Sequence, residues 1–186
     1  VYLMSKYSNT INDYTTAIEA SKTLIDLTQK DELIDWRGEA YQQWGRALIA
    51  ADSYKQAEEK LEKALAIFTK IEDKNKRATV LENLGVLYQN TGNYEKALSY
   101  FEEILKIWRE IGDKIGEGNT LYNIAVIHQT QGNYEEAIAA TQRSLEIRRE
   151  IGDYAGEAYS INQLGVIAFM LSDYTKSEQY FEQVVQ

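Results

Sequence analysis

The sequence contains no cysteine, no proline and a single histidine, His128. Without cysteine the chain can form no disulfide, use no thiolate nucleophile and build no zinc site from Cys ligands. The lack of proline is consistent with long, uninterrupted helices, because proline breaks a helix interior. No stretch approaches the roughly 18 consecutive apolar residues of a membrane-spanning helix, so no membrane partner is expected.

Basic side chains are also fewer than acidic ones, 20 against 29, which gives a net charge of −9. This balance argues against a nucleic-acid backbone or an anionic lipid surface as the main partner. The length of 186 residues fits one domain with a real core, and a hydrophobic fraction of 44% argues against disorder. The chain begins at Val1 and shows no targeting segment, so we expect a piece of a longer, cytoplasmic protein.

A period of 40 residues runs through the whole chain. Segments 81–120 and 121–160 align without a gap and are identical at 18 of 40 positions, which chance does not explain. The same tyrosine recurs once in each period, at Tyr14, Tyr54, Tyr94, Tyr134 and Tyr174. Repetition at this spacing predicts an array of similar units that stack on one another.

Each period is interpreted as two helices joined by short turns. Asp113 suits an N-cap, because its carboxylate can accept from free backbone N–H groups of the first turn, and Asp73 stands in the same place one period earlier. Gly132 is expected to end the first helix in the left-handed conformation. Asn133 is expected to cap the second helix, with Glu136 completing a capping box. The pattern therefore predicts a chain of helical hairpins.

Small side chains mark where the two helices of a hairpin are expected to cross closely. Any residue larger than alanine at these places would push the helix axes apart. The first helices carry them at Gly45, Gly85, Ala125 and Gly165.

These residues resemble the tetratricopeptide repeat (TPR) family. The matching pattern in one copy is Leu84-Gly85, Tyr88, Gly92, Tyr94, Ala97 and Phe101. The period departs from the usual 34 residues, and the usual proline is missing. The longer form is similar to the repeats of kinesin light chain, the LGN/Pins adaptors and many bacterial TPR arrays. The resemblance implies an all-α, right-handed superhelical solenoid of antiparallel helix hairpins.

The whole chain, 1–186, is expected to form this single solenoid, as a fragment of a longer protein. End-to-end self-association of the uncapped repeats is expected, because neither end has an obvious polar capping helix. The predicted repeats are 1–30 (partial), 31–72, 73–112, 113–152 and 153–186 (truncated).

Function is expected on the face of each first helix that the core does not use. In a TPR solenoid these helices line the concave surface, so the resemblance implies that this face binds an extended peptide or a partner helix. We call this face the predicted groove. Its positions are Gln43, Arg46, Thr79, Glu82, Asn83, Val86, Gln89, Asn119, Tyr122, Asn123, Val126, Gln129, Tyr159, Asn162, Gln163, Val166 and Phe169.

Amides occupy one column of the predicted groove, at Gln43, Asn83, Asn123 and Gln163. An amide offers two donors and an acceptor, so such a column can bond the backbone of an extended peptide. In the long-repeat families this asparagine is a peptide clamp, which the resemblance implies for Asn83 and Asn123. The alternative interpretation is a face that is simply solvated.

An apolar patch is expected from Tyr159, Phe169 and Met170. Either a following repeat covers it, or it receives an apolar side chain of the ligand. The TPR co-chaperones that bind chaperone tails hold a carboxylate with a Lys and Arg cluster. The predicted groove has only Arg46, so that specificity is not expected.

Catalytic and metal chemistry find little support in the sequence. His128 aligns with Tyr88 in a packing column, so it is interpreted as an inter-helix residue rather than a base or ligand. Arg148 and Arg149 are interpreted as charges at a helix end, favoured by the helix dipole. No cofactor or metal is expected. The predicted function is a non-catalytic protein–protein interaction scaffold, and the alternative is a regulatory or sensor arm of a larger bacterial signalling or enzymatic protein.

Overall fold

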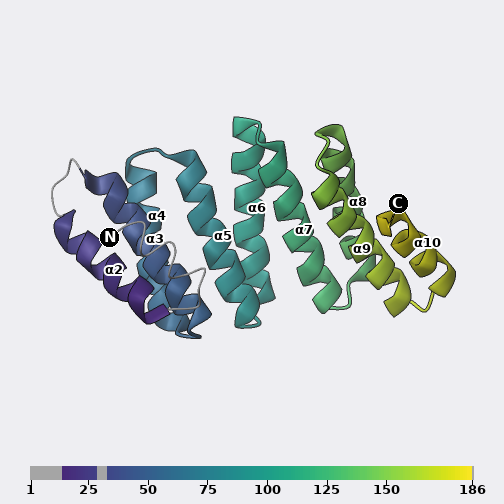
Figure 1. The fold of residues 1–186 in the computed structure, drawn as a ribbon, viewed down its shortest axis with the longest axis horizontal. Helices are drawn as coiled ribbons and strands as arrows, with labels where there is room; N and C mark the ends of the chain where they lie inside the picture. The colour runs from purple at the N-terminus through teal and green to yellow at the C-terminus, as the bar shows by residue number, and fades with distance from the viewer. Residues whose placement is uncertain (1–13, 29–32, 186) are drawn as a thin grey trace. The chain divides into compact units, whose positions relative to one another are not determined.

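The computed structural model describes residues 14–28 and 33–185, and every regular element in these ranges is a helix. The all-α prediction is therefore confirmed for the described residues (Figure 1). Contacts divide the chain into two compact units, residues 1–100 and 101–186, with the boundary inside α6. The helices of the described ranges are α2 (Tyr14–Leu27), α3 (Ile34–Ala50), α4 (Tyr54–Lys70), α5 (Lys74–Asn90), α6 (Tyr94–Ile111), α7 (Lys114–Thr130), α8 (Tyr134–Glu150), α9 (Tyr154–Met170) and α10 (Tyr174–Val185).

Within each unit, consecutive helices pack side by side and reverse direction at every turn (Figure 1). In the first unit α3 contacts α2, α4 and α5. In the second unit α8 contacts α7 and α9, and α9 also contacts α10. The predicted repeat boundaries stay a prediction, although each range from 31–72 onward holds two helices. Residues 1–13 and 29–30 of the predicted first repeat lie outside the described residues.

The turns from the end of α3 onward share one backbone geometry. From residue 52 onward, every twentieth residue has a positive φ, between 55° and 77°. After each of these residues, the next backbone N–H donates to the carbonyl five residues back, as Asn93 does to Tyr88 at 2.9 Å. This hydrogen bond closes a Schellman motif, which ends the helix and satisfies its last carbonyls. Gly132, with φ 77°, confirms the predicted helix end.

Carboxylates cap several helices at their N-termini. Asp73 and Asp113 each accept a hydrogen bond from the backbone N–H three residues on, at 2.9 and 2.8 Å, which confirms both predicted caps. The capping box predicted at Asn133 with Glu136 is wrong, because the Asn133 side chain makes no capping hydrogen bond. Asn93, at the equivalent position one period earlier, does accept from the backbone N–H three residues on at 3.2 Å, so asparagine can cap a helix at this position.

Close helix crossings occur where the sequence places glycine. A Cβ atom on Gly45 of α3 would lie 2.5 Å from Cγ of the fully buried Leu61 on α4. On Gly165 of α9 it would lie 2.7 Å from the Phe181 ring on α10. Ser177 also donates to the Gly165 carbonyl at 2.9 Å, which the same close approach allows. The predicted role of glycine in hairpin packing is therefore confirmed at Gly45 and Gly165.

Candidate binding surfaces

In the first unit, the predicted groove positions lie on α3 and α5, which contact each other. Arg46, Asn83 and Val86 line a cleft of about 330 Å³ at the ends of these helices. The cleft also takes in Asp52 and Asn90, so most of its rim is polar. The structure therefore brings these three predicted positions together in one hollow.

Arg46 sits beside two other predicted positions. Its guanidinium Nη1 donates to Oε1 of the buried Gln43 at 3.4 Å. Burial raises the pKa of the Glu82 carboxyl above its ordinary value, and the charge of Arg46 acts in the opposite direction. Arg46 is itself exposed, so its remaining donors face solvent at the mouth of the cleft.

Asn83 carries an unpartnered donor. Its Nδ2 atom is buried and has no hydrogen-bond partner among the residues that the structure describes. A buried donor left unpaired costs about 1–3 kcal/mol. Such a group in the lining of a cleft is a candidate for contact with a ligand acceptor.

The remaining positions of the first unit do not line this cleft. Thr79 is exposed, and its hydroxyl donates to the Asn75 carbonyl of its own helix at 3.0 Å. Gln89 is half-buried on the last turn of α5. Sequence spacing places these side chains on one helix face, but that face is longer than the hollow.

In the second unit, a buried arginine organises the start of the predicted groove. Arg148 of α8 is only 5% exposed, and its Nη2 donates to Oδ1 of Asn119 at 2.9 Å. Its guanidinium lies 5.8 Å from the ring centroid of Tyr122, and its Nε donates to Ser144 at 3.0 Å. Burial lowers the pKa of Arg148, and the nearby charge of Asp153 opposes that shift. Arg148 therefore positions Asn119 and Tyr122.

Arg148 lies in the last turn of α8, as predicted, but it is also buried, which the helix-end interpretation did not include. The repeat places it in the column of Phe68 and Trp108, two residues that pack between helices. Gly156 on the next helix makes room for it, because a Cβ there would overlap the guanidinium. A basic residue at a position where the other repeats carry a core aromatic, with a glycine on the next helix, is the sequence signal that could have predicted the burial of Arg148. Arg149, by contrast, is exposed and pairs with Glu157 at 2.7 Å.

A second polar chain links α7 and α9. The Nε2 of Gln163 donates to Oε1 of Gln129 at 3.4 Å, and Nε2 of Gln129 lies 3.5 Å from the sulfur of Met170. Gln163 is 4% exposed. Its Oε1 atom is buried and lacks a hydrogen-bond partner in the described part of the chain.

The other predicted positions of the second unit are less closely grouped. Asn123, Val126 and Val166 are half-buried, whereas Asn162 is exposed. The predicted apolar patch is not a single cluster: Tyr159 and Phe169 are ten residues apart on α9, about 15 Å along the helix axis. Phe169 instead packs edge-on against Tyr174, with ring centroids 5.5 Å apart.

His128 is half-buried on α7, and its Nδ1 atom has no hydrogen-bond partner within the described ranges. The described residues hold no group of three or more His, Cys, Asp or Glu side chains placed to bind a metal ion. None of the helices in the described ranges combines the length and apolar character that crossing a membrane requires.

Comparison with known proteins decides the family. A tetratricopeptide repeat model matches residues 36–110, 76–150 and 116–186, each match shifted by one period. The chain belongs to the tetratricopeptide repeat family. The TPR resemblance predicted from the sequence is thus confirmed, and the chain is a helical repeat solenoid. A comparison with curated protein sequences finds no match.

Solved structures share the fold at low sequence identity. BtubC (BKLC) from P. vanneervenii has a TM-score of 0.84 and 18% identity, over 97% of this chain and 75% of that one. The kinesin light chain TPR-like repeats from Podosopora anserina have a TM-score of 0.79 and 18% identity, and the match covers 98% of this chain and 90% of that one. A Rap protein complexed with competence and sporulation factor has a TM-score of 0.73 and 15% identity, and the match covers 97% of this chain and 60% of that one. At these identities the likeness establishes the fold alone.

Proposed function

We propose that this TPR chain is a non-catalytic interaction scaffold that binds an extended segment of a partner polypeptide along the first helices of its repeats. The TPR fold is generally non-catalytic, and family membership suggests an interaction scaffold. The Rap protein solved with competence and sporulation factor supports partner binding by this fold. The predicted groove positions supply the surface for it.

One observation carries this proposal: the unpartnered buried amide atoms lie in the predicted amide column. Asn83 presents a donor without an acceptor, and Gln163 presents an acceptor without a donor, both counted over the described residues. A peptide backbone offers both complements at every residue other than proline. An extended segment would therefore satisfy groups that the free chain leaves unpaired.

The surroundings of these amides favour the same partner. In the first unit Asn83 shares its cleft with Arg46, whose exposed guanidinium can hold a carbonyl or carboxylate of a bound segment. In the second unit Arg148 fixes Asn119 and Tyr122, so these side chains are held in place before a ligand arrives. Preorganised contacts bind more tightly, because less side-chain freedom is lost on binding.

The test uses peptides selected from a random-sequence display library against the parent chain. The double variant Asn83→Ala, Gln163→Ala is expected to weaken the selected peptides by about 5- to 150-fold, equivalent to about 1–3 kcal/mol. Fluorescence anisotropy measures this change. Glu62→Ala, an exposed carboxylate on the second helix α4, is the matched control and is expected to leave affinity unchanged.

The same double variant separates binding from folding. Asn83→Ala removes a buried donor that has no partner, so this substitution is expected to keep thermal stability equal to the parent or raise it. Gln163→Ala also removes the hydrogen bond to Gln129, so it is expected to lower stability by about 0.5–1.5 kcal/mol and leave the chain folded. Peptides that bind the double variant as tightly as the parent, but fail to bind the Glu62→Ala control, would place the binding surface on the second helices instead.

A further inference from the structure

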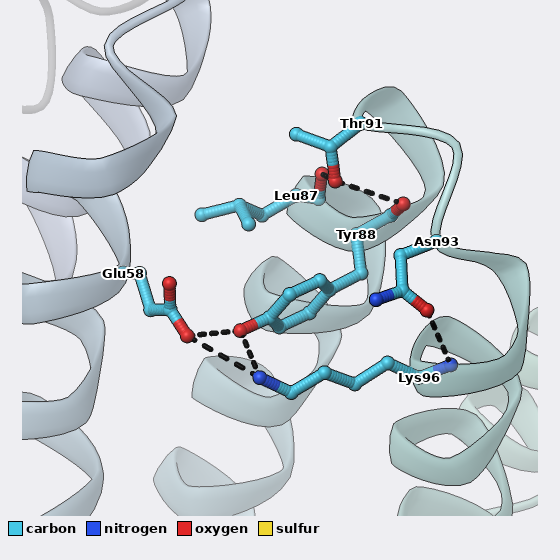
Figure 2. A network of polar contacts seen from close by, with 6 residues as sticks. All are labelled: Glu58, Leu87, Tyr88, Thr91, Asn93 and Lys96. Carbon is cyan, nitrogen blue, oxygen red and sulfur yellow. Dashed lines mark hydrogen bonds and ion pairs between the residues drawn. The ribbon is translucent and has the colours of Figure 1, made fainter.

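In the first unit, the Tyr88 side chain of α5 points toward Glu58 of α4 and Lys96 of α6 (Figure 2). Its ring stacks on Tyr100, with centroids 5.7 Å apart and planes 13° from parallel. Its hydroxyl donates to the Glu58 carboxylate and accepts from the Lys96 ammonium. Lys96 also lies 3.9 Å from the Tyr88 ring centroid and 3.3 Å from Glu58. Tyr100, Glu58 and Lys96 thus form a site for a phenol ring, and the chain's own Tyr88 occupies it.

Two periods later, the second unit keeps the stacking ring and the lysine of this site but has neither the phenol nor the carboxylate at the equivalent positions. Tyr180 stands in the place of Tyr100, and Lys176 stands in the place of Lys96. Ala168 stands in the place of Tyr88. The ring-stacking and ammonium groups are therefore present around a position where the side chain is a single methyl group.

A pocket of about 260 Å³ opens at this position. Ala168 and Leu164 of α9 line it together with Ile138 of α8 and Tyr180 of α10. Drug-sized ligands occupy pockets of about 300–1,000 Å³, so this one suits a group of side-chain size. Ile138 and Tyr180 pack against the buried core around Leu164, which makes the walls part of the folded unit.

The charges at the rim also match those around Tyr88. In the first unit the hydroxyl lies between Lys96 and Glu58. In the second unit the rim carries Lys176 and Asp173, whose charged groups lie 3.1 Å apart. The carboxylate here comes from Asp173, directly before α10, since Ile138 takes the place of Glu58 on α8. A phenol hydroxyl can still accept from the ammonium and donate to the carboxylate.

We propose that this pocket, between α8, α9 and α10, binds a tyrosine side chain of a partner polypeptide in the position that Tyr88 occupies in the first unit. Its lining includes no predicted groove position, so it is a second contact site, separate from the groove. The internal repeat identifies the occupant: the same scaffold, with the same stacking ring and the same lysine, holds tyrosine.

The first experiment probes the pocket with p-cresol, the free side chain of tyrosine, by methyl NMR of the parent chain. Shifts are expected at Ile138, Leu164 and Ala168, and toluene is expected to bind at least threefold more weakly because it lacks the hydroxyl. Lys176→Met, which changes a mostly exposed side chain, is expected to reduce p-cresol binding to the level of toluene. Equal p-cresol affinity in the parent and Lys176→Met would overturn the proposal.

A second arm fills the pocket from within. Ala168→Tyr, alone or with Ile138→Glu, rebuilds the first unit's arrangement and is expected to abolish p-cresol binding and raise the melting temperature. Ala139→Tyr, at an exposed position of α8, is the control and should keep binding. Ala168→Leu covers the case in which the larger variant does not fold, and p-cresol bound normally by a folded Ala168→Leu would also overturn the proposal.

The third arm decides whether the occupant belongs to a polypeptide. Library peptides selected on the parent and depleted on Ala168→Tyr are expected to contain a tyrosine, and its replacement by alanine should cost at least tenfold in affinity. Selected peptides without tyrosine, or binding of p-cresol unaccompanied by any such peptide, would reject a polypeptide partner. The groove variants at Asn83 and Gln163 do not change the lining of this pocket. The groove proposal and the pocket proposal can therefore each be refuted without the other.

Discussion

Single side chains decide how copies of one repeat differ in chemistry. One column carries Phe68, Trp108 and Arg148, and another carries Tyr88 and Ala168 two periods apart. The helices that carry each column begin at equivalent residues and end within one residue of equivalent positions, so the backbone is closely similar. Replacing an aromatic core residue by arginine brings a buried charge to the groove, and replacing tyrosine by alanine opens a pocket.

Glu82 tests the electrostatics of the groove at this scale. Burial raises its pKa above the ordinary 4.5, so its contribution to stability is fully present below 4.5 and is lost as pH rises through the raised value. Arg46→Gln removes the opposing charge and is expected to raise the Glu82 pKa further. A carboxyl ¹³C NMR titration measures both, with Lys70→Gln as an exposed control on α4. A Glu82 pKa at or below 4.5 in the parent would contradict the burial argument.

At the scale of the element, the turns explain the regularity of the chain. Each turn needs one left-handed residue, and glycine supplies it at 92, 112, 132 and 152. Asp52, Glu72 and Ser172 adopt the same conformation with φ between 55° and 62°. A side chain in this conformation costs roughly 1–2 kcal/mol, so the geometry is imposed there by the hairpins on either side.

A pair of substitutions measures this cost. Glu72→Gly is expected to stabilise the chain by about 0.5–1 kcal/mol, because relief of backbone strain outweighs the added freedom of the unfolded chain. Gly132→Ala is expected to destabilise it by about 1–2 kcal/mol. A Cβ at Gly132 meets no atom within 4 Å, so that loss comes from the backbone alone. Denaturant unfolding gives both values, and a neutral Gly132→Ala would refute the strain argument.

For the molecule as a whole, the net charge of −9 biases the choice of partner. Peptides selected from the library are expected to carry net positive charge, because the field of the chain raises their local concentration. Their affinity should fall at least about tenfold between about 0.01 M and about 1 M salt, over which the Debye length shrinks from about 30 Å to about 3 Å. Selected peptides that are neutral and insensitive to salt would show that the field plays no part. The predicted regulatory-arm role and end-to-end self-association stay predictions.

The local features of the fold could be predicted from the sequence, because a few neighbouring residues determine each of them. The period, the turn at Gly132 and the caps at Asp73 and Asp113 were all predicted, and the structure confirms them. The groove could be predicted less well, since spacing placed Thr79 and Arg46 on similar faces although only Arg46 lines the cleft. Asn133 shows that a suitable residue at a cap position does not by itself make the capping hydrogen bond.

The sequence by itself determined the repeat, its helices and its turns, because each depends on hydrogen bonds between residues no more than five positions apart. Only the tertiary structure decided that Arg148 is buried against Asn119 and that Ala168 leaves a pocket. The Arg148 contact joins residues 29 positions apart, and the pocket is lined by residues 138–180 from three helices. Which side chains meet across that separation depends on how neighbouring hairpins fill shared space, a property that no local pattern contains.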